Sequence, residues 1–506
     1  MNATYPACEV GFDPNALVGD EATLVADTDR GLEFAASDPS KKGVRAALVR
    51  RLLVGDSPGT PLSTKPLRIS NLRVMGEIDL SDQKMIRSFF ADNCDFEGPI
   101  RCCRADLLYI ELKNCTVGEN GKTSDAIVID HAKLPQGLSL MGSKIHGEVR
   151  ISFTSVGGNA RFSGTKIHNP FQSPDPASGF NWGKYALNCE GSNFAADLIF
   201  DDGFEAHGEV WLIGMTVVGD IYFRGSFINP PPDPQIAPGS RNAISLARSR
   251  IDGCFYFREV ESVVGVVRLG SLKATVLLDD AESWEKVGVL SLNGFCFESI
   301  GGTSPKTWKM RSAWLKKQDP FARQPWMQTI SVLRAAGHVH DADRLGIEFE
   351  KELGRKKFGK RYALRFWHAV YGWLTAFGYR PQRALYELIA LWGISALFFE
   401  IAARYGVFAP ADPHVFLDPA FDACRAAAQW VACPALSNEY PRFSGVMYAL
   451  DLILPVIDLH LEREWMPMAT TTMGWFARAL AWFDIMLGWV GSVAMVAALT
   501  KLLNRG

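Results

Sequence analysis

The spacing of apolar residues changes twice along the chain. Up to about residue 298, apolar residues occur as short alternating pairs separated by Gly, Asn, Asp and Ser. From about residue 381 to 503 they form long runs broken by one polar loop, and a charged stretch with helical spacing lies between the two regions. Alternation indicates strands, whereas long apolar runs indicate buried or membrane helices. The chain is therefore predicted to be mainly β, with a separate α-helical part at its carboxy-terminal end.

The first region carries an internal repeat bounded by glycines. Residues 137–147 and 208–219 share this repeat, with a Gly at either end, alternating apolar residues and small residues between them. Apolar pairs such as Val210 and Leu212 predict strands of three or four residues, which are stable only when copies stack on one another. Two such units, about 21 residues, would make one coil of a parallel β-helix. A β-sandwich with coincidental glycine spacing is the alternative.

Three segments border or interrupt this repeat. Residues 41–53 have helical spacing and are expected to form a helix that caps the first coil. Two Pro-rich stretches, residues 169–178 and 229–238, break the repeat without ending it and are expected to be loops. The predicted order is a helical cap (1–66), a parallel β-helix solenoid (67–303) and a helical hairpin linker (304–354).

Two apolar stretches are long enough to cross a bilayer as helices. They cover residues 384–405 and 479–503 of a predicted membrane domain at 381–506, and about 20 helical residues span the hydrocarbon layer. Residues 355–383 carry eight Lys or Arg and no acid, whereas the loop 409–474 carries three Arg and eight acids. The positive-inside rule therefore predicts both termini in the cytoplasm and the loop outside. Two core helices of a soluble domain are the alternative.

A basic and aromatic segment precedes the first apolar stretch. It covers residues 355–380 and has the composition of an amphipathic helix that lies on the inner leaflet. The predicted anchors are rings at the lipid interface and basic side chains near anionic head groups, namely Trp367, Trp373, Arg355, Lys356 and Lys357. A soluble packing helix is the alternative.

A shorter apolar segment, residues 444–455, lies inside the outer loop. It is too short to span a bilayer, but it could dip in and return where protein surrounds it. The order of span, short helix, acidic loop and span is that of two-span cation channels. The candidate ion-pathway residues are the carboxylates near such a pore, namely Asp451, Asp458, Glu462, Glu464 and Asp484. The alternatives are a surface helix for the segment and a hydrogen bond to the neighbouring span for Asp484.

Other charges and cysteines near the spans suggest specific pairings. Glu400 and Arg404 are four residues apart on the first span and can form an ion pair. Cys424 and Cys433 are the two cysteines of the outer loop and are expected to form a disulfide in an oxidising compartment. The other eight cysteines fall in the predicted cytoplasmic part, where thiols stay reduced. Residues 1–20 contain no secretory apolar region, which fits a cytoplasmic solenoid.

Enzyme chemistry has little support in the sequence. It contains no phosphate-binding glycine loop, nucleophile elbow or Cys-x-x-Cys pair. Residues 338–343 include two His and two Asp, but helical spacing on both sides favours the polar turn of a helical hairpin over a metal site. The net charge of −2 argues against a general nucleic-acid binder. We therefore expect no catalytic residues, no cofactor and no metal.

The combination of these features resembles a family of bacterial membrane proteins with degenerate pentapeptide-like β-helix repeats and two carboxy-terminal transmembrane helices. The matching elements are the glycine-bounded repeats and four segments, residues 44–53, 324–338, 378–381 and 448–455. Proteins of this kind are often labelled membrane-associated oxidoreductases, but no residue motif here supports a redox site. The resemblance implies a multi-pass protein of the bacterial inner membrane.

Two functional hypotheses follow from this organisation. The first is a membrane-anchored scaffold or sensor whose solenoid presents a cytoplasmic surface to a protein partner. The second is an oligomeric ion channel in which a two-span pore module is gated by the cytoplasmic β-helix. The expected partners are the lipid bilayer, further copies of the chain and, for the first hypothesis, a cytoplasmic protein.

Overall fold

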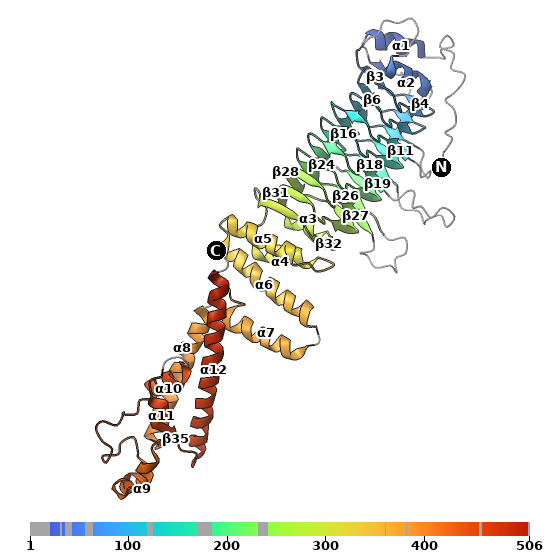
Figure 1. The fold of residues 1–506 in the computed structure, drawn as a ribbon. Helices are drawn as coiled ribbons and strands as arrows, with labels where there is room; N and C mark the ends of the chain where they lie inside the picture. The colour runs from blue at the N-terminus through green and yellow to red at the C-terminus, as the bar shows by residue number, and fades with distance from the viewer. Residues whose placement is uncertain are drawn as a thin grey trace, which may run out of the picture. The chain divides into compact units, whose positions relative to one another are not determined.

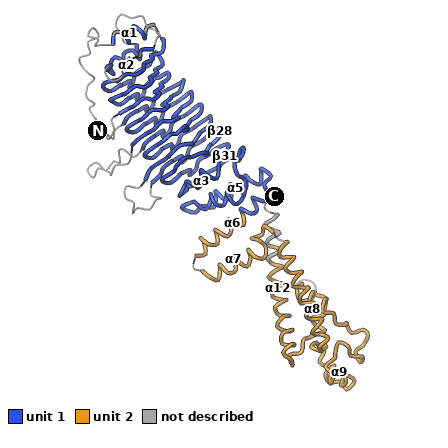
Figure 2. The backbone as a smooth tube through the Cα atoms, turned by 180° about the vertical axis from the view of Figure 1, so that it is seen from behind, with its two compact units in different colours: residues 1–345 blue, residues 346–506 orange. Residues whose placement is uncertain are grey.

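The computed structural model forms two units, residues 1–345 and residues 346–506 (Figure 2). The described residues are 21–30, 33–35, 43–55, 64–118, 125–169, 185–230, 241–359, 361–380, 382–454 and 458–503.

The first unit is a solenoid of short parallel strands stacked in one direction (Figure 1). In one coil, β3 (Leu67–Ser70), β4 (Arg73–Met75) and β5 (Ile78–Asp79) occupy three sides, and a parallel bridge at Lys84 occupies the fourth. The next coil begins with β6 (Phe89–Asp92), which pairs with β3. Equivalent residues lie 22 positions apart in these coils, close to the predicted 21. The parallel pairing confirms the solenoid and excludes the sandwich.

The four sides continue through the stack as follows. The first side contains β1 (Phe34–Ala35), β3, β6, β9 (Ile110–Lys113), β13 (Leu138–Ser139), β17 (Ala160–Arg161), β21 (Leu198–Phe200), β25 (Ile221–Phe223), β28 (Arg250–Phe257), β31 (Lys273–Asp279) and β33 (Cys296–Ile300). The second contains β2 (Gly43–Arg45), β4, β7 (Asp95–Phe96), β10 (Thr116–Val117), β14 (Lys144–His146), β18 (Lys166–His168), β22 (Glu205–His207), β26 (Ser226–Ile228) and β29 (Ser262–Val264). The third contains β5, β8 (Ile100–Arg101), β11 (Asp125–Val128), β15 (Glu148–Arg150), β19 (Tyr185–Asn188), β23 (Glu209–Trp211), β27 (Asn242–Ser245), β30 (Val266–Arg268) and β32 (Val289–Ser291). The fourth contains β12 (Lys133–Leu134), β16 (Ser155–Val156), β20 (Asn193–Phe194) and β24 (Thr216–Val217), which joins β28.

The core of the solenoid consists of inward-facing apolar columns. On the second side, Val74, Phe96 and Val117 lie opposite one another in successive coils, and all three are buried. Each such side chain stabilises the stack by about 1.5 to 3 kcal/mol. A coil has no core of its own, so this burial requires stacking.

The corner between the second and third sides takes two forms. In three coils a single glycine turns it at positive φ, near 130°, at Gly147, Gly208 and Gly265. In the coils that alternate with these, longer segments separate β10 from β11, β18 from β19 and β26 from β27. Both Pro-rich interruptions expected from the sequence fall in such segments, and residues 170–184 and 231–240 lie outside the described residues, so their expected loop structure stays a prediction.

Two asparagines close the larger insertions in the same way. Asn169 Nδ2 donates to the Tyr185 carbonyl over 2.7 Å, and Asn229 Nδ2 donates to the Asn242 carbonyl over 2.6 Å. Both amides are buried. The register shifts by one residue at the start of each following strand, between Tyr185 and Leu187 and between Asn242 and Ile244, and the later residues of these strands pair regularly.

The solenoid starts earlier than the repeat pattern predicts. Residues 43–45 form β2, which pairs in parallel with β4, so the expected helix over 41–53 begins only at Ala46. Val44 stacks on Val74 in the strand column, and this burial outweighs the helical spacing. Helix α2 (Ala46–Val54) contacts the first described coil, where Ile86 N donates to the Leu53 carbonyl. Helix α1 (Glu21–Arg30) precedes β1. A capping role for these helices stays a prediction.

Helices interrupt and then follow the last strands of the first unit. Helix α3 (Ala281–Glu285) lies between β31 and β32, and α4 (Trp308–Lys316), α5 (Gln324–Ala335) and α6 (Val339–Phe358), which continues into the second unit, follow β33. The Arg311 guanidinium of α4 holds the Asp279 carboxylate of β31 through two hydrogen bonds of 2.6 and 2.9 Å. Trp284 Nε1 donates to the same carboxylate over 2.7 Å. All three side chains are buried, so this cluster joins α3 and α4 to the final coils.

The second unit is mostly helical. Its elements are α7 (Tyr362–Thr375), α8 (Gln382–Arg404), β34 (Phe408–Pro410), the 3₁₀ turns Pro413–Phe416 and Pro419–Phe421, α9 (Asp422–Ala427), α10 (Gly445–Ile453), α11 (Leu461–Glu464), β35 (Trp465–Pro467) and α12 (Thr472–Leu503). The expected spans correspond to α8 and α12, which pack against each other. The antiparallel pair β34 and β35 joins the end of α8 to the start of α12. Helix α12 starts at Thr472 rather than at the predicted residue 479.

Candidate functional site: the helices α7, α8, α10 and α12

Helices α8 and α12 are long, apolar and largely uncovered. Helix α8 has 23 residues, about 34 Å of helix, against roughly 30 Å of bilayer hydrocarbon. In the most apolar stretch of each helix, only 22% of α8 and 28% of α12 is buried inside the protein. Large apolar side chains point outward from both helices, among them Ile394, Leu397, Phe476, Trp482 and Val493. Core helices of a soluble protein would bury these residues, so their exposure favours membrane helices over the alternative.

The short helix α10 lies lengthwise along these two helices. Its first residue contacts α8, because a Cβ added at Gly445 would lie 2.6 Å from the Glu400 nitrogen. Its last residue contacts α12, since a Cβ added at Gly488 would lie 2.3 Å from the Ile453 carbonyl oxygen. Trp392 Nε1 also donates to the Val446 carbonyl over 3.0 Å. Helix α10 therefore runs beside α8 and α12, as a re-entrant segment would; Pro455, which follows it, lies outside the described residues.

The Glu400 carboxylate contacts α10 instead of the predicted ion-pair partner. Its Oε2 accepts from Gly445 N over 3.1 Å, at the amino end of α10. The expected pairing with Arg404 is thus replaced by a contact with the positive end of a helix dipole. No spacing rule in the sequence indicates this contact, because the two residues lie 45 positions apart.

Asp484 is fully buried between α8 and α12. Its Oδ1 accepts from Ser395 Oγ over 3.0 Å, whereas Oδ2 has no hydrogen-bond partner among the described residues. The predicted alternative, a hydrogen bond to the neighbouring span, is therefore present. The unpartnered oxygen is unusual for a buried carboxylate, and a role in an ion pathway stays a prediction.

Three of the four predicted pore-mouth carboxylates lie close together at the end of α10. Asp451 is buried, and its two oxygens accept from the backbone amides of Leu459 (2.6 Å) and Glu462 (2.9 Å). Asp458 pairs with Arg463 over 2.9 Å. Burial, and then the charges of Asp451 and Asp458, raise the pKa of Glu462 above its ordinary value. Asp451 thus also has a structural role in shaping this turn.

A disulfide in the loop before α10 and hydrogen bonds to the backbone of Glu464 connect the segments at this end of the unit. Cys424 and Cys433 form a disulfide with an Sγ–Sγ distance of 2.06 Å. The Glu464 carbonyl accepts from Ala411 N and from the Tyr440 hydroxyl, so its backbone supports the β34–β35 connection.

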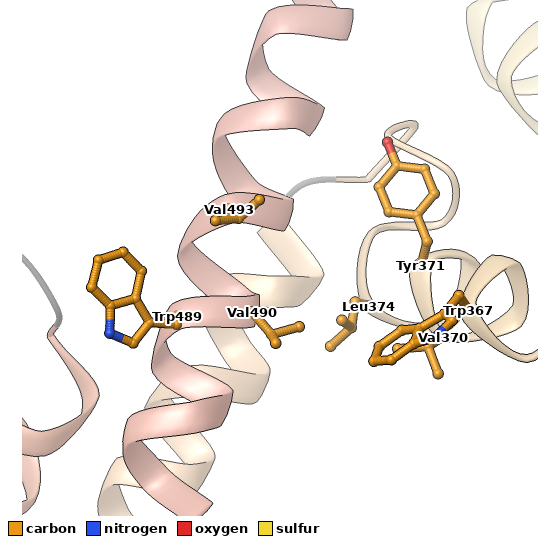
Figure 3. A pocket seen from close by; sticks show the side chains of 7 residues that line it. All are labelled: Trp367, Val370, Tyr371, Leu374, Trp489, Val490 and Val493. Atoms are coloured by element: carbon orange, nitrogen blue, oxygen red, sulfur yellow. The ribbon is translucent and has the colours of Figure 1, made fainter.

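Helix α7 exposes most of its aromatic residues. Trp367 and Trp373 are 60% and 62% exposed, and Arg355, Lys356 and Lys357 at the end of α6 are exposed as well. An apolar groove of about 400 Å³ separates α7 from α12 (Figure 3). Its walls are Trp367, Val370, Tyr371 and Leu374 of α7, and Trp489, Val490 and Val493 of α12. The anchor role predicted for these rings and charges remains a prediction.

A column of histidines on the solenoid was not predicted from the sequence. His146, His168 and His207 lie opposite one another in β14, β18 and β22. Burial, and then the charges of the two neighbours, lower the pKa of His168. The sequence does contain a signal for this column, because Lys-Ile-His occurs at 144–146 and again one coil later at 166–168.

The solenoid also buries acidic groups on its third side. Glu209 accepts from Ser245 Oγ over 2.7 Å, and burial raises the pKa of Glu148 to about 7. Across the described residues, His, Cys, Asp and Glu side chains nowhere form a group of three or more able to hold a metal ion. Two acids of the 338–343 segment have other partners: Asp341 accepts from Trp308 N, and Asp343 pairs with Arg334.

Compared with protein-family models, with curated proteins and with solved structures, the chain has no match in any of the three.

Proposed function

We propose that the chain is a membrane-anchored scaffold or sensor that presents its solenoid to a protein partner in the cytoplasm. The observation that carries the proposal is the exposure of apolar side chains along α8 and α12, in the same chain as a long and regular solenoid. The anchor would be a bacterial inner membrane, as the resemblance implies, with both termini on the cytoplasmic side.

The charge and cysteine distribution supports this orientation. The basic residues between 355 and 383 precede α8, and positive charge marks the cytoplasmic side of a membrane helix. The disulfide between Cys424 and Cys433 lies in the connection at the other end of α8, where an oxidising compartment would keep it formed.

The solenoid has features of a binding surface rather than an active site. Neighbouring coils are linked on the outside by ion pairs such as Arg73–Glu97 and Arg101–Glu77, which give a regular polar exterior. Three insertions leave it at a single corner, every second coil. Solenoids use extended surfaces of this kind to bind partners.

Substituting exposed apolar residues separates a membrane anchor from a soluble helix pair. Ile394 is 68% exposed on α8, and Val218 is 54% exposed on the solenoid. An Asp inside a membrane helix costs about 3 kcal/mol of insertion free energy, whereas an Asp on a water-exposed surface costs almost nothing. Ile394→Asp should move the protein from the carbonate-resistant membrane fraction to the soluble or degraded fraction, and Val218→Asp should not. Equal behaviour of the two variants would contradict the anchor.

A second candidate is an oligomeric ion channel, and the position of α10 favours it. A short helix packed lengthwise against two long apolar helices is the arrangement of a pore helix between two spans. Two spans per chain cannot enclose a pore, so the channel requires several copies. Mass photometry of the detergent-purified chain should give a ring of three or more subunits for a channel, and a monomer or dimer would exclude it.

The contacts of Asp451 and Asp458 decide which of the two carboxylates can be substituted to test the channel. Asp451 is buried and each of its oxygens accepts from a backbone amide, so Asp451→Asn would lose one of these hydrogen bonds and change the fold of the turn. Asp458 is exposed, its Oδ1 accepts from His460 N and its Oδ2 pairs with Arg463, so Asp458→Asn can keep the backbone contact. Asp458→Asn should therefore change ion flux while leaving assembly intact if the carboxylates line a pore mouth. Unchanged flux in a conducting preparation would remove Asp458 from the pathway.

A further inference from the structure

The groove between α7 and α12 is lined by apolar side chains alone. Figure 3 shows Val490 of α12 pointing toward Leu374 of α7 across the groove. A volume of about 400 Å³ lies within the range of ligand-binding cavities, and water gains no hydrogen bonds from such walls. An apolar occupant therefore fits the groove better than water does.

The contacts of α12 show where the groove lies along α8. A Cβ added at Gly491, next to Val490, would lie 2.9 Å from Leu388 Cδ2 of α8. Leu388 is in the second turn of α8, which starts at Gln382. The groove therefore lies near the first residues of α8, which is the end that would face the inner leaflet in the proposed orientation.

Basic side chains precede and begin this end of α8. Arg380 lies in the turn before α8 and Arg383 lies in its first turn, where it is exposed. The other exposed basic residues of this stretch, Arg355, Lys356, Lys357, Arg361 and Arg365, lie at the end of α6, directly before α7 and on its first half. No Asp or Glu occurs from residue 355 to residue 383. A surface of this charge attracts anionic head groups, and basic residues next to an apolar cavity at the cytoplasmic side match both parts of a phospholipid.

We propose that this groove is a binding site for one anionic phospholipid, with an acyl chain between α7 and α12 and the head group at the basic residues. This inference rests on the proposed membrane anchor, because in the cell the groove meets phospholipid only if α8 and α12 lie in a bilayer. It goes beyond the anchor, since general attraction to a membrane predicts no stoichiometric lipid and no dependence on the groove walls.

The test uses the full-length chain, delipidated in detergent and examined by native mass spectrometry. Phosphatidylglycerol and phosphatidylcholine with identical acyl chains are added in turn. We expect one phosphatidylglycerol per chain and an affinity at least about tenfold above that for phosphatidylcholine. Arg380→Gln combined with Arg383→Gln should reduce this preference for phosphatidylglycerol without abolishing binding of the acyl chain.

Variants of the groove walls give the decisive comparison. Leu374→Trp should fill the groove from α7 and abolish the bound lipid, and Val490→Trp should do the same from α12. Trp373 is on α7 but does not line the groove, so Trp373→Leu should keep the lipid. Retention of the lipid in both filled variants would overturn the site.

The remaining outcomes separate this inference from the proposed function. A chain that stays in the carbonate-resistant membrane fraction, yet binds the two lipids equally, refutes the lipid site and leaves the anchor intact. If carbonate extracts the chain and it stays soluble without detergent, both the lipid site and the membrane anchor are refuted. If the filled variants change the subunit number in mass photometry and not lipid binding, the groove is a subunit contact and the lipid assignment is wrong.

Discussion

The buried cluster of Arg311, Asp279 and Trp284 predicts a large loss of stability on a single substitution. In Arg311→Leu the Asp279 carboxylate keeps Trp284 Nε1 but loses both guanidinium hydrogen bonds while remaining fully buried. Leaving one member of a buried ion pair uncompensated costs about 3 to 5 kcal/mol. With a urea dependence of about 3 kcal/mol/M, the unfolding midpoint should fall by about 1 to 1.7 M.

The assay is pulse proteolysis of the full-length chain in detergent over a urea series, reading the protease-resistant solenoid fragment. Arg73→Leu is the matched control, because Arg73 forms an ion pair with Glu97 over 2.5 Å but is 61% exposed. An exposed pair contributes less than about 1 kcal/mol. Replacing both Arg311 and Asp279 with apolar residues should recover most of the loss. Equal midpoints for Arg311→Leu and Arg73→Leu would refute the reasoning.

Three further predictions concern other parts of the molecule. Glu148→Gln should stabilise the solenoid at high pH, because the native pKa of Glu148 is about 7 against an ordinary 4.5, and the wild type loses stability as pH rises between these values. The gain in unfolding free energy over wild type, followed through the melting temperature, should be absent at pH 4 and complete above pH 8, on the order of 3 kcal/mol. Gly488→Ala should lower the melting temperature in detergent, because its Cβ meets a carbonyl of α10, whereas Gly393→Ala, with no atom within 4 Å, should raise it slightly or leave it unchanged. Cys424→Ser with Cys433→Ser should lower the unfolding free energy by about 2 to 3 kcal/mol and make the melting temperature insensitive to reductant.

The solenoid could be predicted because its signal is local and repeated. The residues 137–147 and 208–219 show glycine corners and alternating apolar pairs in one short stretch of chain, and stacking is the one way to bury strands this short. The first strands could not be predicted in the same way. Val44 fits a helical pattern as well as a strand pattern. The strand forms because Val44 stacks on Val74 in the next coil, a contact that the local sequence does not reveal.

The partners of the contacts between helices of the second unit could not be predicted from the sequence. A hydrogen bond between Asp484 and the neighbouring span was one alternative, but its partner Ser395 lies 89 residues away, and the pairing depends on the rotation of α8 and α12 about their axes. Apolar composition identifies such helices, but it leaves that rotation open when apolar residues occur all round. Asp451 was predicted as a pore carboxylate from its type and place in the loop, whereas its backbone contacts appear only once the turn is built.

The corner between the second and third sides has a consequence for how this protein can diversify. Asn169 and Asn229 close the stem of each larger insertion, and the register becomes regular again within two residues of Tyr185 and Asn242. Segments there can therefore change in length and composition with little effect on the coils beyond. Loop closure becomes only slightly more costly as a loop lengthens. The insertions emerge every second coil, so their stems are about 9 to 10 Å apart along one edge. The solenoid thus holds the stems of these segments at even spacing along one edge, so their sequences can change while the sequence of the core stays the same.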